Sequence, residues 1–129
     1  MIEMSENAPE VDPYGSQYSN FATELYADIR DATYDEDIGQ NGWLTATEQD
    51  LLIKWLALEP AARLLDVACG SGGPTLRIAE VPGCRVEGVD IHADAIRTAQ
   101  QTAAERGLGA RATFHQTDAS AAYRHDPPL

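Results

Sequence analysis

The chain has 129 residues, of which 43% are hydrophobic, so its length allows one domain with a modest core. Nine basic and 21 acidic residues give a formal net charge of −12. No cluster of Lys or Arg interrupts this acidic excess, and a phosphate backbone would be repelled. We therefore exclude nucleic acid as a direct partner.

The sequence carries no recognisable targeting segment. Its first thirteen residues are polar and acidic, and no window approaches the roughly 20 apolar residues of a membrane-spanning helix. Cys69 and Cys84 are too few and too far apart for a disulfide scaffold, and no CxxC or His-rich spacing indicates a metal site. We expect a cytoplasmic protein with two reduced thiols, no metal and no membrane partner.

Two helices are predicted ahead of the first strand. Ser19 or Asn20 can cap the first of them, in which Phe21, Leu25 and Ile29 recur at helical spacing. We expect this apolar stripe to cover a core.

The second helix begins at a capping-box pattern, Thr45-Ala46-Thr47-Glu48, and Pro60 stops it. Its apolar face carries Leu51, Leu52, Trp55 and Leu56.

From Arg63 onward, short apolar runs alternate with amphipathic helices, which is typical of parallel βαβ units. The predicted strands are 63–67, 85–89 and about 110–115. Helices lie between them, one from Pro74 to about Glu80 and one that carries Ile96, Ala99 and Ala103 and ends before Gly107.

The segment 64–74 combines a buried strand, a glycine turn and a helix start. The strand ends on the carboxylate of Asp66, the glycines let a ligand approach the backbone closely, and Pro74 suits the first helical turn. This pattern predicts a cradle for a nucleotide cofactor.

Three carboxylates, those of Asp66, Asp90 and Asp118, fall at or just beyond the ends of the predicted strands, where ligands bind in open α/β sheets. Asp90 lies 18 residues after Gly72, a spacing at which an acid reaches ribose hydroxyls. Each acid also has a structural interpretation. Asp66 could accept hydrogen bonds from loop amides, Asp90 could cap the next helix, and Asp118 could be a turn residue.

The run Asp66-Val67-Ala68-Cys69-Gly70-Ser71-Gly72 resembles motif I of the class I S-adenosylmethionine-dependent methyltransferases, and the resemblance covers about residues 44–119. It implies a Rossmann-like α/β methyltransferase fold with S-adenosyl-L-methionine as cofactor. Ala68, Gly70 and Gly72 would lie against the methionine end, with Asp66 near its amino group. The motif usually has glycine where this chain has Ala68, which leaves less room beside the cofactor.

Two further segments match the family. Gly88-Val89-Asp90-Ile91 implies that Asp90 binds the ribose diol and that Ile91 packs on the adenine. Asp118-Ala119 implies hydrogen bonds to the adenine, from the side chain at its amino group and from the following backbone amide.

The segment 35–44 resembles the leader of small-molecule methyltransferases, where it covers the cofactor. Tyr34 or Trp43 could then contact the sulfonium or the substrate through an aromatic face. Packing within the core or the lid is the alternative role for both rings.

Family members continue past the position of Asp118 into further strands that this sequence lacks. We therefore expect a fold truncated to about three parallel strands in the order 3-2-1, with flanking helices and an N-terminal helical lid. Residues 1–44 would form the leader and cover, 45–122 an incomplete cofactor-binding region, and 123–129 an irregular tail. The first strand would lie at an open edge, through which the chain could self-associate.

The resemblance implies transfer of a methyl group to an unidentified small molecule, with this chain as the cofactor-binding half and inactive alone. We assign no catalytic residue, because His92, His115 and His125 lack a partnered acid in the sequence pattern and are expected to be surface or cap residues. A non-catalytic cofactor-binding fragment or truncated product is the alternative. A dinucleotide-binding Rossmann protein is a further one, although Ala68 and Thr75 break the required glycine spacing and Asp66 would repel a pyrophosphate.

Overall fold

The structure, a computed structural model, describes residues 15–40, 42 and 44–120. Three parallel strands form one sheet in the order β1-β2-β3, which confirms the predicted topology. The strands are β1 (Arg63–Val67), β2 (Arg85–Asp90) and β3 (Ala112–Gln116). The helices of the described part are α1 (Gly15–Asn20), α2 (Glu24–Thr33), α3 (Ala46–Leu56), α4 (Gly73–Glu80) and α5 (Ala93–Glu105).

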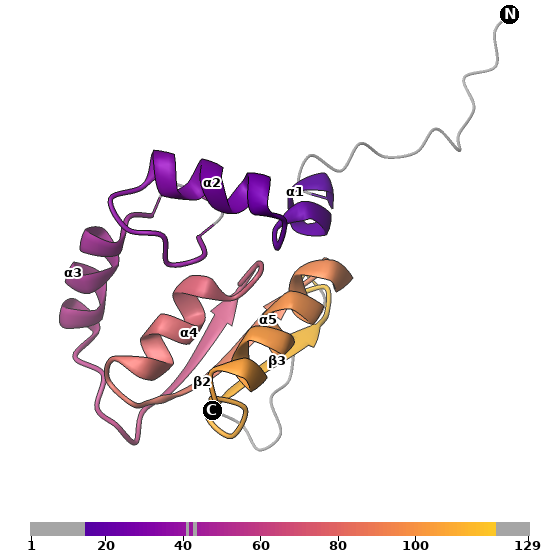
Figure 1. The fold of residues 1–129 in the computed structure, drawn as a ribbon. Coiled ribbons are helices and arrows are strands. Elements are labelled where there is room, and N and C mark those ends of the chain that lie inside the picture. The colour runs from indigo at the N-terminus through magenta and orange to yellow at the C-terminus, as the bar shows by residue number, and fades with distance from the viewer. Residues whose placement is uncertain (1–14, 41, 43, 121–129) are drawn as a thin grey trace, which may run out of the picture.

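The two crossover helices, α4 and α5, lie together on one face of the sheet, as right-handed βαβ connections require (Figure 1). The core forms between these helices and the sheet, and its fully or nearly fully buried side chains include Leu76, Ala79, Val86, Ala99 and Phe114. Beyond the carboxyl ends of the strands lie α1 and α2 (Figure 1). This arrangement is the Rossmann-like fold expected from the sequence.

Local signals set most of the helix boundaries. The capping box of α3 is present, because the Thr45 hydroxyl accepts from the Glu48 backbone N–H and the Glu48 carboxylate accepts from the Thr45 N–H. Pro74 lies in the first turn of α4, and Gly107, with φ of +69°, follows the end of α5 as predicted. None of the described helices is long and apolar enough to cross a bilayer.

The predicted first helix is present as α2, but its predicted start at Ser19 or Asn20 is wrong. The helical structure is interrupted between Asn20, where α1 ends, and Thr23, which is the N-cap of α2. Phe21 lies in this break and is buried, with the guanidinium carbon of Arg30 at 4.2 Å from its ring centroid. Leu25 is 65% exposed, and the predicted stripe therefore does not cover the core.

The apolar face of α3 also remains exposed in the described structure. Exposed fractions along it run from 42% at Leu52 to 70% at Trp55. The helix is held instead by polar contacts, since the Gln49 amide donates to the Pro74 carbonyl at 2.7 Å and Arg77 pairs with Asp50 at 2.7 Å. Next to it, β1 has β2 as its strand partner and no second one among the described residues.

Several predicted features lie outside the described residues. They are the polar leader over the first thirteen residues, Trp43, His125 and the irregular tail 123–129.

Gly73, at the start of α4, packs closely against the backbone of Ile38 and Gly39. A Cβ at this position would lie 2.3 Å from the Ile38 carbonyl oxygen and 2.4 Å from that of Gly39. We expect Gly73→Ala to lower the free energy of unfolding by about 1–3 kcal/mol, because backbone atoms would have to move. Urea unfolding measures this. Gly109→Ala is the control, since its Cβ would meet no atom within 4 Å, and an equal loss in both variants would contradict the close contact.

Candidate functional site

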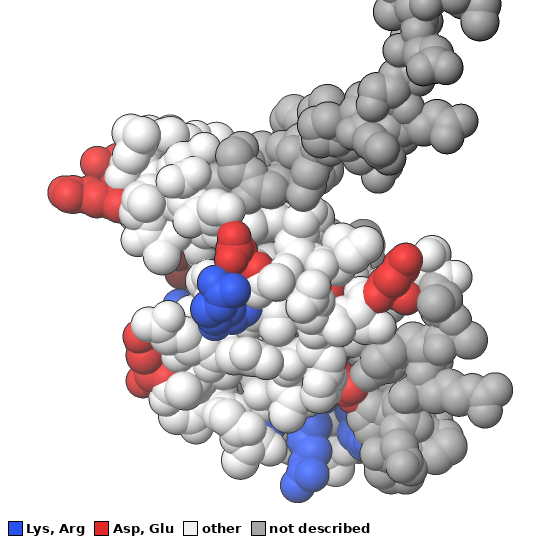
Figure 2. Space-filling model, turned by 90° about the vertical axis from the view of Figure 1, so that its right-hand side faces the viewer, with Lys and Arg blue, Asp and Glu red and all other residues white. Residues whose placement is uncertain are grey.

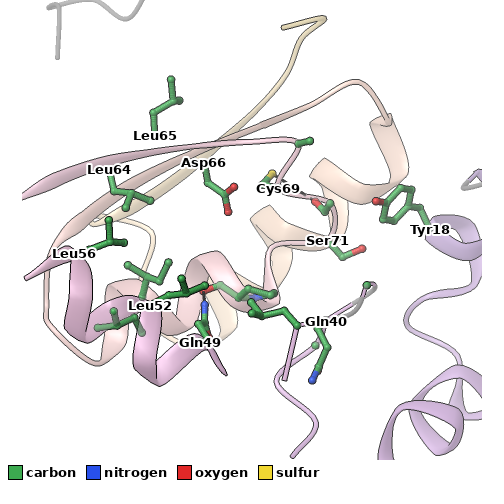
Figure 3. Close-up of a pocket in the computed structure, with 18 residues that line it drawn as sticks. Tyr18, Gln40, Gln49, Leu52, Leu56, Leu64, Leu65, Asp66, Cys69 and Ser71 are labelled. Atoms are coloured by element: carbon green, nitrogen blue, oxygen red, sulfur yellow. Dashed lines mark hydrogen bonds between the residues drawn. The ribbon is translucent and has the colours of Figure 1, made fainter. Parts of the chain in front are cut away.

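Two adjoining cavities lie around the carboxyl end of β1, one alongside this strand and one beyond the ends of the strands. The first, which we call the loop cavity, has a volume of about 480 Å³. It lies between α3, β1 and residues 68–72, which we call the glycine loop (Figure 3). The second, the strand-end cavity, has a volume of about 510 Å³ and is formed by the ends of all three strands. Tyr18 and Ala68 line both.

The structure brings most of the predicted site residues to these cavities. The strand-end cavity is lined by Ala68, Asp90, Ile91, Asp118 and Ala119. The loop cavity is lined by Asp66, Ala68 and Gly70. Gly72 lines neither, and a Cβ there would lie 2.8 Å from that of Ala99. Gly72 is therefore required by the packing of the loop on α5.

Asp90 is buried at the end of β2 and uses both carboxylate oxygens. Oδ2 accepts from the Gly70 backbone N–H at 2.9 Å, which fixes the glycine loop. Oδ1 accepts from the His92 backbone N–H at 2.9 Å and also lies 2.9 Å from Nδ1 of the His92 ring. His92 is the N-cap residue of α5, so Asp90 supports the start of this helix as well as the loop.

Asp66 and Ser71 give the loop cavity unsatisfied polar character. The Thr75 hydroxyl donates to Asp66 Oδ2 at 2.5 Å, and no Lys or Arg of the described residues pairs with this carboxylate. Burial raises the pKa of Asp66, the Thr75 hydrogen bond opposes the rise, and the charge of Asp90 adds to it. Ser71 Oγ is buried without a hydrogen-bond partner in the described part of the chain. A ligand with a cation and a hydrogen-bond acceptor would satisfy both groups.

Asp118 follows β3 and is exposed. Its Oδ1 accepts from the backbone N–H of Ser120 at 2.9 Å and from the Ser120 hydroxyl at 2.6 Å, and these bonds hold the pKa of Asp118 below its ordinary value. Asp118 is thus a turn residue in this structure, at the rim of the strand-end cavity.

Ala68 adopts a left-handed backbone conformation, with φ of +61°. Its Cβ costs energy there, which explains why glycine is the usual residue of the motif. Ala57, at the C-cap of α3, has φ of +47° and lines neither cavity.

The expectation that the histidines lack acidic partners is wrong for the two that are described. His92 pairs with Asp90, and Nε2 of His115 lies 3.3 Å from Oε1 of Glu87. Parallel strand pairing places His115 of β3 beside β2, which sequence spacing alone does not indicate. His92 is a cap residue as expected.

Sequence reasoning missed Tyr18, Ser71 and Thr75. Thr75 lies one turn into α4, and its hydroxyl reaches back to Asp66. Tyr34, a predicted aromatic contact for the ligand, donates its hydroxyl to the Gly42 carbonyl and lines neither cavity. No periodic pattern marks Tyr18, because its place depends on how α1 packs on α5.

Comparison with known proteins shows the family to which this fold belongs. Residues 64–127 match the family model described as a methyltransferase domain. A crystal structure of an S-adenosylmethionine-dependent methyltransferase from Geobacter sulfurreducens, in complex with S-adenosyl-L-homocysteine, has a TM-score of 0.66 at 26% identity. The matched region covers 89% of this chain and 40% of the Geobacter protein. The chain belongs to the S-adenosylmethionine-dependent methyltransferase family.

Curated relatives within this methyltransferase family carry different acceptors in their names. The chain is 39% identical over 59 residues to geranyl diphosphate 2-C-methyltransferase of Saccharopolyspora erythraea, which is 46% of this chain and 21% of that enzyme. It is 37% identical over 75 residues to the 23S rRNA (uracil(1939)-C(5))-methyltransferase of a Shewanella species, which is 58% of this chain and 16% of that enzyme. The chain therefore spans about a fifth of the length of these relatives, and it corresponds to part of a full methyltransferase.

We expect Ala68→Gly to raise the free energy of unfolding by about 1 kcal/mol, because glycine adopts positive φ without strain. Ala57→Gly should give a similar gain outside the site. Urea unfolding compares both with Ala104→Gly on the exposed face of α5, which should be destabilising by about 1 kcal/mol. A loss of stability in Ala68→Gly would contradict the strained conformation.

Proposed function

We propose that the chain binds S-adenosylmethionine across the two cavities, as the cofactor-binding part of an enzyme that methylates a small molecule. One observation carries the proposal. Asp66, Asp90 and Asp118 gather with the glycine loop at a single edge of the sheet, in a chain whose family uses this cofactor.

In the loop cavity, the cofactor's methionine end would satisfy the two groups that the chain leaves unsatisfied. Its ammonium would pair with Asp66, whose half-buried carboxylate otherwise has no cationic partner among the described residues. Its carboxylate would accept from the Ser71 hydroxyl, which has no partner among the described residues. Ala68 and Gly70 would lie alongside. These residues therefore fit the amino-acid portion of the cofactor.

In the strand-end cavity, Asp90 would accept hydrogen bonds from the ribose diol. A carboxylate has about four lone-pair sites, and the backbone N–H groups of Gly70 and His92 and the His92 ring occupy three of them. One hydroxyl of the diol would take the fourth site, and the other would displace the His92 ring. Ile91, 57% exposed, would pack on the adenine. Asp118 and the backbone N–H of Ala119 would bond to the adenine edge, with Asp118 giving up part of its turn contacts to Ser120.

The bound cofactor supplies a methyl group on a positively charged sulfur, which departs as a neutral thioether when the acceptor atom bonds to that methyl. The chain's own contribution is to hold the donor in a fixed place, and alignment of this kind is worth up to roughly 7–11 kcal/mol. We assign no general base, since His92 and His115 are engaged with Asp90 and Glu87. Binding rather than turnover is therefore the appropriate measurement for this chain.

A small molecule is the acceptor that charge favours. The relative named for 23S rRNA raises the alternative of an RNA acceptor, but this chain has a formal net charge of −12. On the face shown in Figure 2, the Lys and Arg atoms of the described residues form no continuous patch. An RNA backbone would therefore meet net repulsion.

We expect the chain to bind S-adenosylmethionine and S-adenosylhomocysteine more tightly than NAD, because Asp66 repels a pyrophosphate. Isothermal titration calorimetry with the three ligands measures this. Asp90→Asn should weaken binding of the first two by roughly 1.5–3 kcal/mol, as the charged acceptor of the ribose is lost.

Glu105→Gln is the matched control, because it makes the same change at an exposed residue at the end of α5. Tighter binding of NAD would overturn the cofactor assignment. Equal losses in the two variants would show that Asp90 acts only within the fold.

The proposed location is the cytoplasm, supported by two buried, unpaired cysteines. Burial raises the pKa of the Cys69 thiol to about 12, and the charges of Asp66 and Asp90 add to the rise. The Cys69 thiol therefore stays protonated and unreactive.

Self-association through β1 is a further part of the proposal. The outer edge of β1 has no strand partner among the described residues, and the exposed apolar face of α3 lies beside it. Val67, at the end of this strand, is 54% exposed. Such an edge attracts another strand, which the net charge of −12 only partly opposes.

We expect light scattering to show a mass that rises with concentration, and melting temperatures that change with it. Val67→Lys should reduce the association, because a charge on an edge strand disfavours pairing. Thr113→Lys on β3, at the opposite edge, adds the same charge and should have little effect. A chain that stays monomeric with a concentration-independent melting temperature would contradict this part of the proposal.

A further inference from the structure

We infer that Tyr18 is a positioning residue that closes over the middle of the bound cofactor and favours its positively charged sulfur over a neutral one. The inference rests on the proposed function. It concerns a residue that lies outside the glycine loop and the strand ends.

Tyr18 stands where the two cavities meet. Among the described residues, Tyr18 and Ala68 are the two that line both of them. Ala68 belongs to the loop after β1, whereas Tyr18 comes from α1, and its side chain points toward the loop (Figure 3). A ligand that extends from one cavity into the other must pass between these two residues.

The Tyr18 ring lies close against the glycine loop. A Cβ on Gly70 would be 3.1 Å from the Tyr18 hydroxyl oxygen and 3.2 Å from Cε1, so a side chain there would press on the ring. On its other side, the Tyr18 ring centroid is 4.8 Å from that of His92, with the planes tilted by 47°. The ring therefore spans from the loop to the residue that contacts Asp90.

Contacts between α1 and α5 hold the ring in this place. The Ser19 hydroxyl donates to Oδ2 of Asp94 at 2.8 Å, and Asp94 also pairs with Arg97. The same Ser19 contact, followed by that of Arg97, lowers the pKa of Asp94, so the anchoring carboxylate stays ionised. Tyr18 is thus carried by a short helix that is tied to the first turn of α5.

The charge on the cofactor's sulfur gives the Tyr18 ring a role. If the amino-acid end occupies the loop cavity and the nucleoside end the strand-end cavity, the sulfur lies at their junction, next to Tyr18. An aromatic ring attracts a cation that lies within about 6 Å of its centroid, and a neutral thioether lacks this attraction. Asp66 and Asp90 also attract a cation, so the contribution of the ring has to be isolated by substitution.

The test measures the dissociation constants of S-adenosylmethionine and S-adenosylhomocysteine by calorimetry. The quantity compared between variants is the ratio of the first constant to the second. We expect Tyr18→Phe to keep the wild-type ratio. Tyr18→Leu should shift the ratio against S-adenosylmethionine by ~3- to 10-fold, the range for a cation–aromatic contact. Tyr34→Leu is the control, because this aromatic residue lines neither cavity, and it should leave the ratio unchanged.

A general loss of packing would weaken both ligands alike and leave the ratio unmoved, and that result in Tyr18→Leu would overturn the inference. An equal shift in Tyr18→Phe and Tyr18→Leu would also overturn it, since the hydroxyl and not the ring would then be responsible. Ser19→Ala tests the same point without removing the ring, and a shift smaller than that of Tyr18→Leu supports the assignment. Failure of the wild-type chain to bind either ligand would instead overturn the proposed function.

Discussion

The carboxylate of Asp90 ties together three parts of the molecule. One oxygen accepts from the backbone of the glycine loop after β1, and the other accepts from the backbone that begins α5. Both donors belong to loops at the carboxyl ends of parallel strands, where backbone N–H groups have no strand partner. A single acid at the end of β2 therefore fixes the glycine loop, and residues of this loop line both cavities.

This arrangement has a cost for ligand binding. His92 places its ring nitrogen on the same oxygen of Asp90 that holds its own backbone N–H. A diol that binds to Asp90 joins a network that is already in use, rather than an empty carboxylate. Asp66 and Ser71 are different, because Asp66 has one hydrogen-bond donor, Thr75, and no cationic partner in the described chain, and the Ser71 hydroxyl has no partner there. The affinity for a ligand should therefore come largely from the loop cavity.

Features written in adjacent residues could be predicted from the sequence. The strand 63–67, the capping box at Thr45 and the three acids at strand ends all follow from local patterns, and the structure places them as expected. The break at Phe21 could not be foreseen, because it depends on a contact with Arg30 in the next helix. The pairs that His92 and His115 make with acids, and the position of Tyr18, likewise depend on how separate elements pack.

Strand order has a consequence for how the chain acquires its shape. Each strand pairs with the one that precedes it in the sequence, so no pairing has to wait for a distant segment. Ordering of this kind keeps the loops that must close short, which favours rapid folding. During synthesis, the glycine loop and Asp90 can meet as soon as β2 has left the ribosome, and β3 then adds at the free side. The cradle is thus assembled from its first strand outward, in the same direction as translation.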